Sequence, residues 1–300
     1  MRAIAPGKLV LTGAYAVLLG APAIVAAVDR YAVADASSED AKAPDADVRA
    51  LYDARGRKLG LGSSAAAVVA SLGARALAGA EDIRSPASRA RIFRAAREAH
   101  ARSQGGGSGV DVASSVYGGV LRYAVDPSGE AKLQPLDLPA GVHLVAYDSG
   151  ASARTSELLA RFHALRASGR SSGILSLLED LAMRAAAAVE RGDPAAFVGS
   201  AAHFGRALAR LGEACDAPIV PPAFAELGAL AELESAAFFP SGAGGGDVAV
   251  WLGLAPPSAA FESRAEALAM RPLGLRIDRG GLRPESPLTS DPSPAIRGRA

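Results

Sequence analysis

Three glycine-rich segments in this sequence could bring backbone N–H groups close to an anionic ligand. The first is KLGLGSSAA, from Lys58 to Ala66, and it leads into an Ala- and Val-rich run typical of a helix. Glycines let the backbone turn its N–H groups toward a ligand, and a helix start adds unpaired N–H groups and a positive dipole end. The adjacent hydroxyls of Ser63 and Ser64 could bond a phosphate oxygen or ligate Mg²⁺. The segment is therefore a candidate phosphate-binding loop, although a glycine turn with a serine helix cap would give the same string.

The same segment also satisfies the dinucleotide-binding pattern G-x-G-x-x-[GA] through Gly60, Gly62 and Ala65. Glu81 and Asp82 lie near the spacing of the acid that would bind a ribose. That pattern must follow an apolar strand, however, and the preceding residues, YDARGRK, are charged. The sequence lacks the pattern G-x-x-x-x-G-K-[ST] of nucleotide-binding P-loops. A dinucleotide-dependent enzyme therefore ranks as a distant second interpretation.

Two further glycine-rich segments each carry a carboxylate. QGGGSGVDVASSVYGG, residues 104–119, places Asp111 between two valines, and SGAGGGD, residues 241–247, ends at Asp247. An acid between apolar neighbours is usually a helix cap or a surface group. Beside a phosphate loop it becomes a candidate base or orienting group. Three such segments in one chain favour a common phosphate-containing ligand over three unrelated turns.

The elements that must position these loops change in character along the chain. In the first half we expect strands and helices, with strands at 8–12, 23–28, 119–124 and 142–147 and helices at 63–78, 85–101 and 110–117. From Thr155 onward, Ala-, Leu-, Arg- and Glu-rich segments predict helices at 155–167, 173–191, 194–212 and 222–237, before a strand at 248–252. Ser63 or Ser64 is the expected N-cap of the helix after the first loop. A mostly helical half is expected to begin near residue 150, and the Pro/Ser-rich tail, residues 286–300, is expected to be disordered.

Composition limits the partners of the protein. The sequence has 32 Lys and Arg against 31 Asp and Glu, so it lacks the charge excess of a nucleic-acid-binding protein. The longest apolar stretch, from Tyr15 to Val28, is interrupted and shorter than the roughly 20 residues that span a bilayer. We interpret it as two strands and a turn, and expect no membrane partner. Cys215, the only cysteine, cannot form an internal disulfide, and the N-terminus lacks a signal-peptide pattern, so the cytoplasm is the expected location. The expected partner is a small molecule, and the sequence allows a homodimer.

Taken in order, four segments of the chain resemble the signature segments of the GHMP kinase superfamily, which includes galactokinase, homoserine kinase, mevalonate kinase and phosphomevalonate kinase. They are APGKLVLTGAYAVLLG, KLGLGSSAAAVVA, GSGVDVASSVYGG and SGAGGGDVAVWLG, and they cover Ala5 to about Gly253. The resemblance implies an α+β GHMP kinase fold. Its N-terminal α/β domain, similar to ribosomal protein S5 domain 2, would span residues 1–150 and be shortened between 30 and 58. A ferredoxin-like α+β domain would follow at 151–285, and the activity implied is that of a phosphotransferase using ATP and Mg²⁺.

Within the superfamily the chain most resembles phosphomevalonate kinases. A Lys precedes their phosphate loop, as Lys58 does here, and Ala-His at 99–100 followed by Gln104 and GSGVDVA is also similar. DSGASARTSELL, residues 148–159, resembles a substrate-side segment shared by mevalonate and phosphomevalonate kinases. The resemblance therefore implies mevalonate 5-phosphate as the phosphoryl acceptor, in the mevalonate route to isoprenoids, with mevalonate as the alternative.

Carried over residue by residue, the resemblance implies a role for each loop. Lys8 would stand beside the transferring phosphoryl group, and Asp111 would be the catalytic carboxylate. The residues expected to bind the nucleotide are Lys58, Gly60, Leu61, Gly62, Ser63, Ser64, Ala65, Gly242, Ala243, Gly244 and Gly245. Those expected to bind the acceptor are Ser108, Gly109, Arg154 and Thr155, with Lys58 and Arg122 as further cations for an acceptor phosphate. Ser64 is the expected Mg²⁺ ligand through ATP, and Glu98 is a weaker second candidate.

Three departures from the family pattern keep another hypothesis open. Ala14 stands where the family usually has Glu, and His100 stands where mevalonate kinases carry a Mg²⁺-binding Glu. The short segment between Lys8 and Gly60 would remove part of the adenine pocket. A chain with these losses could be a metabolite-binding pseudokinase of the same fold.

Overall fold

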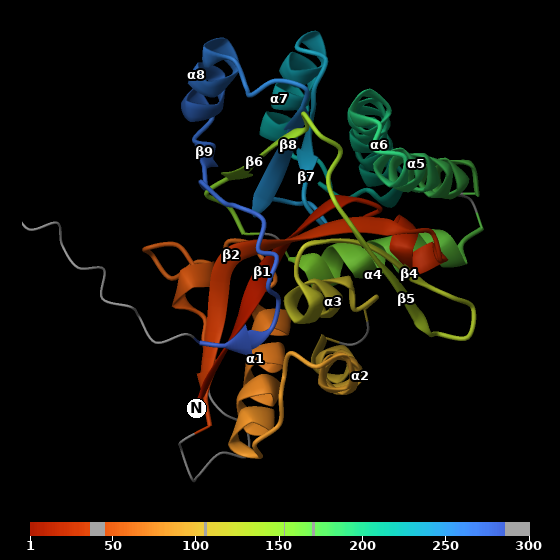
Figure 1. Cartoon of the computed structure of the whole chain (residues 1–300). Helices are drawn as coiled ribbons and strands as arrows, with labels where there is room; N and C mark the ends of the chain where they lie inside the picture. The colour runs from red at the N-terminus through yellow and green to blue at the C-terminus, as the bar shows by residue number, and fades with distance from the viewer. Residues whose placement is uncertain (37–45, 105–106, 153, 170–171, 286–300) are drawn as a thin grey trace, which may run out of the picture.

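The computed structural model describes residues 1–36, 46–104, 107–152, 154–169 and 172–285. Within these ranges the chain forms two antiparallel sheets with helices packed around them (Figure 1). The tail 286–300, expected to be disordered, and residues 105–106 of the second glycine-rich segment lie outside the described residues.

The first sheet is built around two long apolar strands. Its strands are β1 (Arg2–Thr12), β2 (Ala23–Asp35), β3 (Ala46–Asp47), β4 (Val120–Val125), β5 (Ala131–Leu136) and β10 (Arg283–Pro284). Their order is β10-β1-β2-β4-β5, and β3 pairs with β2. The β1–β2 register shifts between Pro6 and Gly7 and again between Val10 and Thr12. Such irregularities bend a strand and re-aim its side chains, and here they flank Lys8.

Three helices lie on one side of the first sheet: the first and third begin within the first two glycine-rich segments and pack on the strands, and the second packs against these two helices. They are α1 (Ser63–Ala78), α2 (Pro86–Gln104) and α3 (Val110–Tyr117), and a short 3₁₀ helix η2 (Arg49–Leu51) precedes them. In Figure 1 they lie on the side of β1 and β2 opposite the second sheet. The buried face of α1 is mostly alanine, which allows the helix to approach the strands closely. The helices expected at 63–78 and 110–117 are confirmed.

The second sheet is formed by β6 (His143–Asp148), β7 (Ala237–Pro240), β8 (Val248–Gly253) and β9 (Arg271–Pro272), in the order β7-β8-β6-β9. Its helices are α4 (Thr155–Ala167), α5 (Ser172–Glu190), α6 (Pro194–Cys215), α7 (Pro222–Leu233) and α8 (Ala259–Ala267). Successive side chains of β7 point to opposite faces, as a strand requires. Phe238 meets Phe224 of α7 and Phe261 of α8, whereas Phe239 meets Phe204 of α6.

Several expected boundaries were wrong. The stretch from Tyr15 to Val28 contains a 3₁₀ helix, η1 (Ala16–Leu19), before a single strand. The helix expected to run to 237 ends at Leu233, because Ser235 adopts a left-handed conformation that a helix cannot continue through. The sequence interpretation also missed β5, β7 and α8.

The two sheets do not divide the chain at residue 150. Strand β6 precedes that boundary but pairs with β8 and β9 in the second sheet. The C-terminal end of the described chain returns to the first sheet, where β10 pairs with β1 and Leu282 is fully buried against α1. Asp278 fixes this return because its carboxylate accepts hydrogen bonds from the N–H groups of Gly280 and Gly281.

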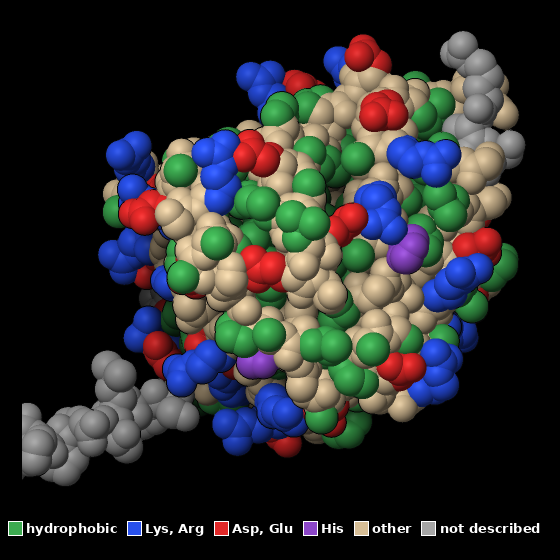
Figure 2. Space-filling view, turned by 90° about the horizontal axis from the view of Figure 1, so that it is seen from above, with side chains coloured by type: hydrophobic (Ala, Val, Ile, Leu, Met, Phe, Trp, Pro, Cys, Tyr) green, Lys and Arg blue, Asp and Glu red, His purple; other side chains and the backbone are tan. Residues whose placement is uncertain are grey.

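The surface carries both signs of charge. On the face seen in Figure 2, Lys and Arg side chains alternate with Asp and Glu side chains, in keeping with the nearly balanced totals. Every helix in the described part of the chain is too short or too polar to cross a membrane.

Candidate active site

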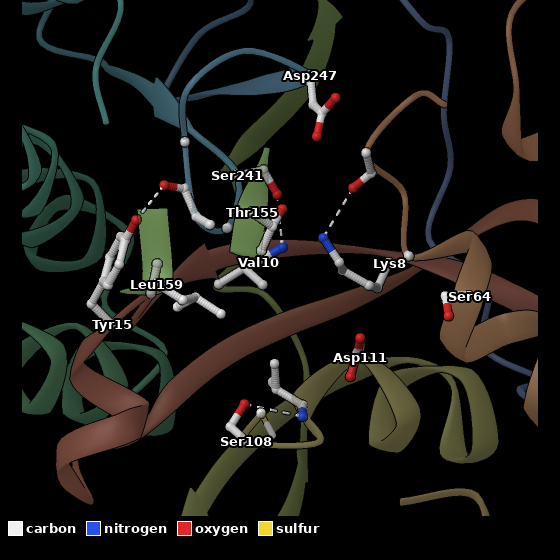
Figure 3. A pocket seen from close by; sticks show the side chains of 18 of the residues that line it. Lys8, Val10, Tyr15, Ser64, Ser108, Asp111, Thr155, Leu159, Ser241 and Asp247 are labelled. Carbon is white, nitrogen blue, oxygen red and sulfur yellow. Dashed lines mark hydrogen bonds between the residues drawn. The ribbon is translucent and has the colours of Figure 1, made fainter. Parts of the chain in front are cut away.

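The three glycine-rich segments meet at one cavity of about 480 Å³. It lies where β1, α1, α3, α4 and the loop between β7 and β8 come together. Of the expected site residues, the lining contains Lys8, Lys58, Gly60, Gly62, Ser63, Ser64, Ser108, Gly109, Asp111, Arg154, Thr155, Gly242, Ala243 and Gly244. Lys8, Ser64 and Asp111 lie towards one end of the view, Tyr15 and Leu159 lie towards the other, and Val10 lies between them (Figure 3).

Lys8 is positioned by the close approach of the first glycine-rich loop to β1. A Cβ on Gly7 would lie 2.8 Å from the Leu61 carbonyl oxygen, so only glycine permits this contact. The Lys8 backbone N–H donates to that carbonyl at 2.8 Å, and the Lys8 Nζ donates to the Gly60 carbonyl at 3.0 Å (Figure 3). Both ends of Lys8 are therefore tied to the same loop, and its side chain lies in the cavity wall.

Two opposing effects act on the Lys8 ammonium. Burial lowers the pKa of Lys8 below its usual 10.5, and the nearby carboxylates of Asp111 and Asp247 partly offset this by raising it. The side chain nevertheless keeps some exposure to the cavity. A partly desolvated cation between two carboxylates interacts more strongly with an anionic ligand than a lysine in open water would.

The start of α1 is open to a ligand. The helix begins at Ser63 with Gly62 as its N-cap, in a left-handed conformation and without a side-chain cap bond. The expectation that Ser63 or Ser64 caps this helix was therefore wrong. A Cβ on Gly62 would lie 3.0 Å from the Lys8 Cγ, so glycine also leaves room for the lysine. The first N–H groups of such a helix end need partners, and an anion is a suitable one.

Asp111 lies in the first turn of α3, where a negative charge is favourable to the helix dipole. One carboxylate oxygen accepts a 2.9 Å hydrogen bond from the Val112 N–H. The other lies 3.6 Å from Nε2 of His100, a residue of α2 that also lines the cavity. Ser115 donates to the Pro6 carbonyl at 2.8 Å and so anchors α3 to β1 next to Lys8.

The third glycine-rich segment closes the cavity from the second sheet. A Cβ on Gly60 would lie 2.5 Å from the Asp247 Cβ, so the first and third loops are in direct contact. The Val10 N–H donates to the Ser241 hydroxyl at 2.8 Å, and the Tyr15 hydroxyl donates to the Ala243 carbonyl at 2.6 Å (Figure 3). These bonds join β1 and the turn after it to a loop more than 220 residues later in the sequence.

Comparison with known proteins agrees with this arrangement. Residues 31–119 match the family model of the GHMP kinases N terminal domain. The chain is 28% identical to the phosphomevalonate kinase of Streptomyces sp. (strain CL190), over 83% of this chain and 88% of that protein. Its structure resembles Streptococcus pneumoniae phosphomevalonate kinase in complex with phosphomevalonate and AMPPNP, with a TM-score of 0.77, 17% identity, and coverage of 92% of this chain and 99% of that one. It also resembles L. major mevalonate kinase in complex with R-mevalonate, with a TM-score of 0.67, 18% identity, and coverage of 96% and 97%.

The chain has the GHMP kinase fold. The α+β fold expected from the sequence is therefore confirmed. The chain crosses between the two sheets of this fold at β6 and again before β10, and the division into domains at 1–150 and 151–285 stays a prediction.

Some expected site residues of this GHMP kinase fold lie outside the cavity lining. Leu61 and Ala65 are buried, and Leu61 contributes its carbonyl to Lys8. The Gly245 N–H donates to the Ile219 carbonyl, so it holds the third loop in place. Arg122, on β4, pairs with Glu190 of α5 at 3.1 Å.

The position of Glu98 does not support the expectation that it binds a metal ion. Its side chain is 74% exposed on α2 and lies 4.0 Å from Arg102, one turn further along the same helix. It is also absent from the residues that line the cavity. In the described part of the chain, no three His, Cys, Asp or Glu side chains cluster in a way that could hold a metal ion.

Arg154 and Thr155 lie at the start of α4 on the cavity rim. Arg154 is largely exposed and pairs with Glu157 at 2.9 Å. On the opposite wall, the Ser108 hydroxyl accepts a 3.4 Å hydrogen bond from the Val110 N–H, and the Ser108 carbonyl accepts from the Tyr123 hydroxyl. The structure thus brings the four expected acceptor residues to two sides of one cavity.

Sequence reasoning gave no site role to several lining residues. His100 was noted for the Ala-His pair that resembles phosphomevalonate kinases and as a departure from the mevalonate kinase pattern, and Tyr15, Ser152 and Ser241 were not selected. Tyr15 has a rare backbone conformation for a residue with a side chain, with φ 62° and ψ −44°, and the Ala16 N–H donates to the Ala14 carbonyl across it. Its position inside the GAYAVLLG segment was the only sequence signal available.

A second cavity of about 470 Å³ adjoins the first at the start of α1. Lys58, Ser63 and Ser64 line both cavities. The rest of its wall is mainly apolar and comes from β3, the two residues that flank η2, α1 and α2, including Val48, Tyr52, Val68, Leu72 and Ala99. The segment that is short in the sequence therefore still contributes a cavity wall.

Proposed function

We propose that this protein is a small-molecule kinase that transfers the γ-phosphoryl group of ATP to mevalonate 5-phosphate, giving mevalonate 5-diphosphate. The placement of Lys8 carries the proposal. Its ammonium lies against the first glycine-rich loop, near two carboxylates and close to the junction of two cavities. Two cavities that share one loop suit two substrates that exchange one phosphoryl group.

The second cavity suits the base of the nucleotide. Tyr52, Val68 and Leu72 offer apolar contacts for a flat ring, and the cavity leads to the uncapped start of α1. The triphosphate would then reach the backbone N–H groups of the glycine-rich loop, where a helix dipole favours anions. This arrangement supports an active kinase over the pseudokinase hypothesis, because the shortened segment still provides a slot for the base. AMPPNP, an ATP analogue, is bound in the S. pneumoniae relative.

The residues at the shared loop also suit Mg²⁺ bound together with ATP. Mg²⁺ prefers oxygen ligands and usually takes several of them from substrate phosphates and water. Ser64 provides a hydroxyl at the junction of the cavities, and Asp111 provides a carboxylate on the facing wall. When bound, Mg²⁺ would neutralise part of the phosphate charge.

Phosphoryl transfer depends mainly on positioning and charge stabilisation. An oxygen of the acceptor attacks the γ-phosphorus, the bond to the β–γ bridging oxygen breaks, and ADP leaves. Lys8 would stabilise the negative charge on the γ-phosphoryl oxygens in the transition state. Asp111, held by the Val112 N–H and near His100, would orient the acceptor or take its proton.

The charges of the cavity favour an acceptor that already carries a phosphate. Lys58 and Arg154 line the larger cavity in addition to Lys8. Cations beyond the one needed for ATP suit a doubly charged acceptor phosphate, which accepts charge-assisted hydrogen bonds well. The relative from Streptomyces, with the highest identity reported above, is a phosphomevalonate kinase.

The test is a coupled ADP-release assay with mevalonate 5-phosphate, mevalonate, homoserine and galactose as acceptors. We expect turnover with mevalonate 5-phosphate. Because the second pKa of a phosphate is about 6, the rate should rise through that pH in both the wild type and Asp111→Asn. With an alcohol acceptor, Asp111→Asn should lose about 10²- to 10⁴-fold, the usual range for general-base catalysis.

Each pattern of results decides between the functions. Turnover of mevalonate but not mevalonate 5-phosphate would replace the proposed acceptor and leave a kinase. Tight ATP binding without turnover of any acceptor would favour the pseudokinase. Absence of ATP binding by the folded protein would contradict the kinase proposal altogether.

A further inference from the structure

Arg57 joins the segment before the first glycine-rich loop to the second sheet. Its Nη2 lies 2.8 and 2.7 Å from the two carboxylate oxygens of Asp148, the last residue of β6, and 3.0 Å from the carboxylate of Asp53. Its Nη1 donates to the Ala151 carbonyl at 2.9 Å. The side chains of Arg57 and Asp148 are only 18% and 14% exposed, so this is a largely buried ion pair.

Asp148 and Ala151 belong to residues 148–152, the end of β6 and the turn after it, which we call the acceptor-side turn. The third glycine-rich loop holds the same turn. The Asp247 N–H donates to the Ala151 carbonyl at 3.2 Å, and the Ser149 N–H donates to the Asp247 carbonyl at 2.9 Å. The turn ends at Ser152, which lines the larger cavity. The acceptor-side turn is therefore bonded both to Arg57 and to the third glycine-rich loop.

On its other side, Arg57 is close in sequence to the nucleotide end of the site. It directly precedes Lys58, which lines both cavities, and Lys58 is followed by the loop that receives the Lys8 ammonium at Gly60. The hairpin that carries Arg57 is itself braced, because the Asp53 N–H donates to the Arg57 carbonyl and the Asp53 carboxylate accepts from the Arg57 N–H, both at 2.8 Å. A shift of Arg57 would thus be transmitted to the loop.

We propose that Arg57 is a positioning residue that locks the first glycine-rich loop to the acceptor-side turn through Asp148 and Ala151. The Arg57–Asp148 ion pair thereby keeps the phosphoryl donor and the acceptor at a fixed distance from each other. This inference rests on the proposed kinase function. The planar guanidinium of Arg57 is needed for this role. It can donate to a carboxylate and a carbonyl at once in fixed directions, whereas the ammonium of a lysine acts as a point charge.

The expected signature is a loss of turnover without a matching loss of nucleotide binding. Misplacement of reacting groups by about 1 Å can cost on the order of 10²-fold in rate. We expect Arg57→Gln and Asp148→Asn each to lower kcat by about 10- to 100-fold, while the Kd for AMPPNP changes less than about threefold. Because the two residues act as one unit, the double variant should lose no more than either single variant. Arg57→Lys should recover little.

A matched control separates positioning from stability. Arg283 and Asp278 form a similarly buried pair, at 2.8 Å, that braces the C-terminal return, and neither residue lines either cavity. Arg283→Gln should lower the melting temperature at least as much as Arg57→Gln and leave kcat unchanged. Asp148→Asn keeps the shape of the side chain, so it provides a folded variant if Arg57→Gln does not fold.

The outcomes are distinct. The positioning role would be overturned if the losses in kcat of Arg57→Gln and Asp148→Asn added up in the double variant. It would also be overturned if Arg283→Gln, at an equal loss of stability, lowered kcat as much as Arg57→Gln. So would a fall in AMPPNP affinity as large as the fall in kcat. A wild type that binds AMPPNP but turns over no acceptor would contradict the proposed function instead. The inference is then tested by hydrogen exchange of residues 148–152, which AMPPNP should protect in the wild type and not in Arg57→Gln. Equal protection in both proteins would overturn it.

Discussion

At the scale of single residues, Lys8 shows how burial and function oppose each other. Burial lowers the pKa of its ammonium, and the carboxylates of Asp111 and Asp247 restore part of it. The two carboxylates thus offset part of the cost of burying an ammonium group at this position. A shifted pKa of this kind is typical of residues that stabilise the charge which develops during a reaction.

We expect the pH dependence of the reaction to show this lowered pKa. The rate should fall as pH rises toward 10, because Lys8 loses its proton at a lower pH than an exposed lysine. Lys8→Arg should retain a reduced rate without this basic limb, because the guanidinium stays charged. Lys8→Ala should lose about 10²- to 10³-fold in kcat. The measurement is kcat between pH 7 and 10.5, and a wild-type rate independent of pH over this range would remove Lys8 from the transition state.

The same pKa predicts an opposite trend in stability. Between the lowered folded pKa and 10.5, the unfolded chain binds more protons at Lys8 than the folded chain, so wild-type stability gains with rising pH. The cost of burying the charge is fully present below the folded pKa. The free energy of unfolding of Lys8→Met, relative to the wild type, should therefore decline from neutral pH toward pH 10.5. Denaturant titrations at several pH values measure this difference.

At the scale of elements, the close contact of the first and third glycine-rich loops gives a second prediction. Gly60 has a φ of 72°, and a Cβ there would lie 2.5 Å from the Asp247 Cβ. Gly60→Ala should therefore separate the loops, lower kcat by at least about 10²-fold and reduce the free energy of unfolding by about 1–3 kcal/mol. Kinetics and denaturant unfolding of the same variant test both effects.

Gly192, between α5 and α6, offers a matched control for this change. Its φ is 66°, close to that of Gly60, but a Cβ there would meet nothing within 4 Å, and the residue lines neither cavity. Gly192→Ala therefore carries the backbone strain without the clash, and we expect a loss of stability with nearly normal kcat. If Gly192→Ala slows the enzyme as much as Gly60→Ala, the contact between the loops does not matter for turnover.

Local signals explain which elements the sequence could predict. The helices at 63–78 and 110–117 follow glycine turns and have strong apolar patterns, so their bounds were correct. The N-cap at Ser63 or Ser64 was wrong because Gly62 begins the helix without a side-chain cap. Helix starts that bind ligands often break local rules in this way. Strand β7 was missed because only three residues separate it from α7, and the sequence pattern predicted that the helix continues to 237.

The candidate site likewise contains residues that local sequence patterns could predict and residues that they could not. The motifs identified Lys8, Asp111 and the loops, and the structure places most of them around one cavity. The Arg57–Asp148 pair could not be predicted, because a charged residue in YDARGRK has no periodicity or spacing that indicates a partner 91 residues away. Contacts of that kind follow from the three-dimensional fold and not from a local pattern.

At the scale of the whole molecule, the chain crosses between its two sheets more than once. Strand β6 leaves the N-terminal half for the second sheet, and residues 276–285 return to the first. The main hydrophobic core contains residues of both sheets, from Ala5 on β1 to Val250 on β8. Continuous packing of this kind predicts that the two sheets unfold together.

Leu282 gives a test of this cooperativity. It is fully buried at the C-terminal return, and its Cδ1 would lie 2.6 Å from a Cβ on Gly73 of α1. Leu282→Ala should lower the free energy of unfolding by about 2–5 kcal/mol, the usual cost of such a truncation. The exposed Leu233, truncated in the same way, should change it by less than about 0.5 kcal/mol.

The readout can be placed in the other sheet. Trp251, the only tryptophan, is buried on β8 and packs against Phe261 with ring centroids 4.5 Å apart. In Leu282→Ala, the denaturation midpoints from Trp251 fluorescence and from far-ultraviolet circular dichroism should fall together. A fluorescence midpoint that stays at the wild-type value while the circular dichroism midpoint falls would mean that the second sheet unfolds by itself. In that case the return of the chain stabilises only the sheet that carries Lys8, and the cavity between the loops would open before the molecule unfolds.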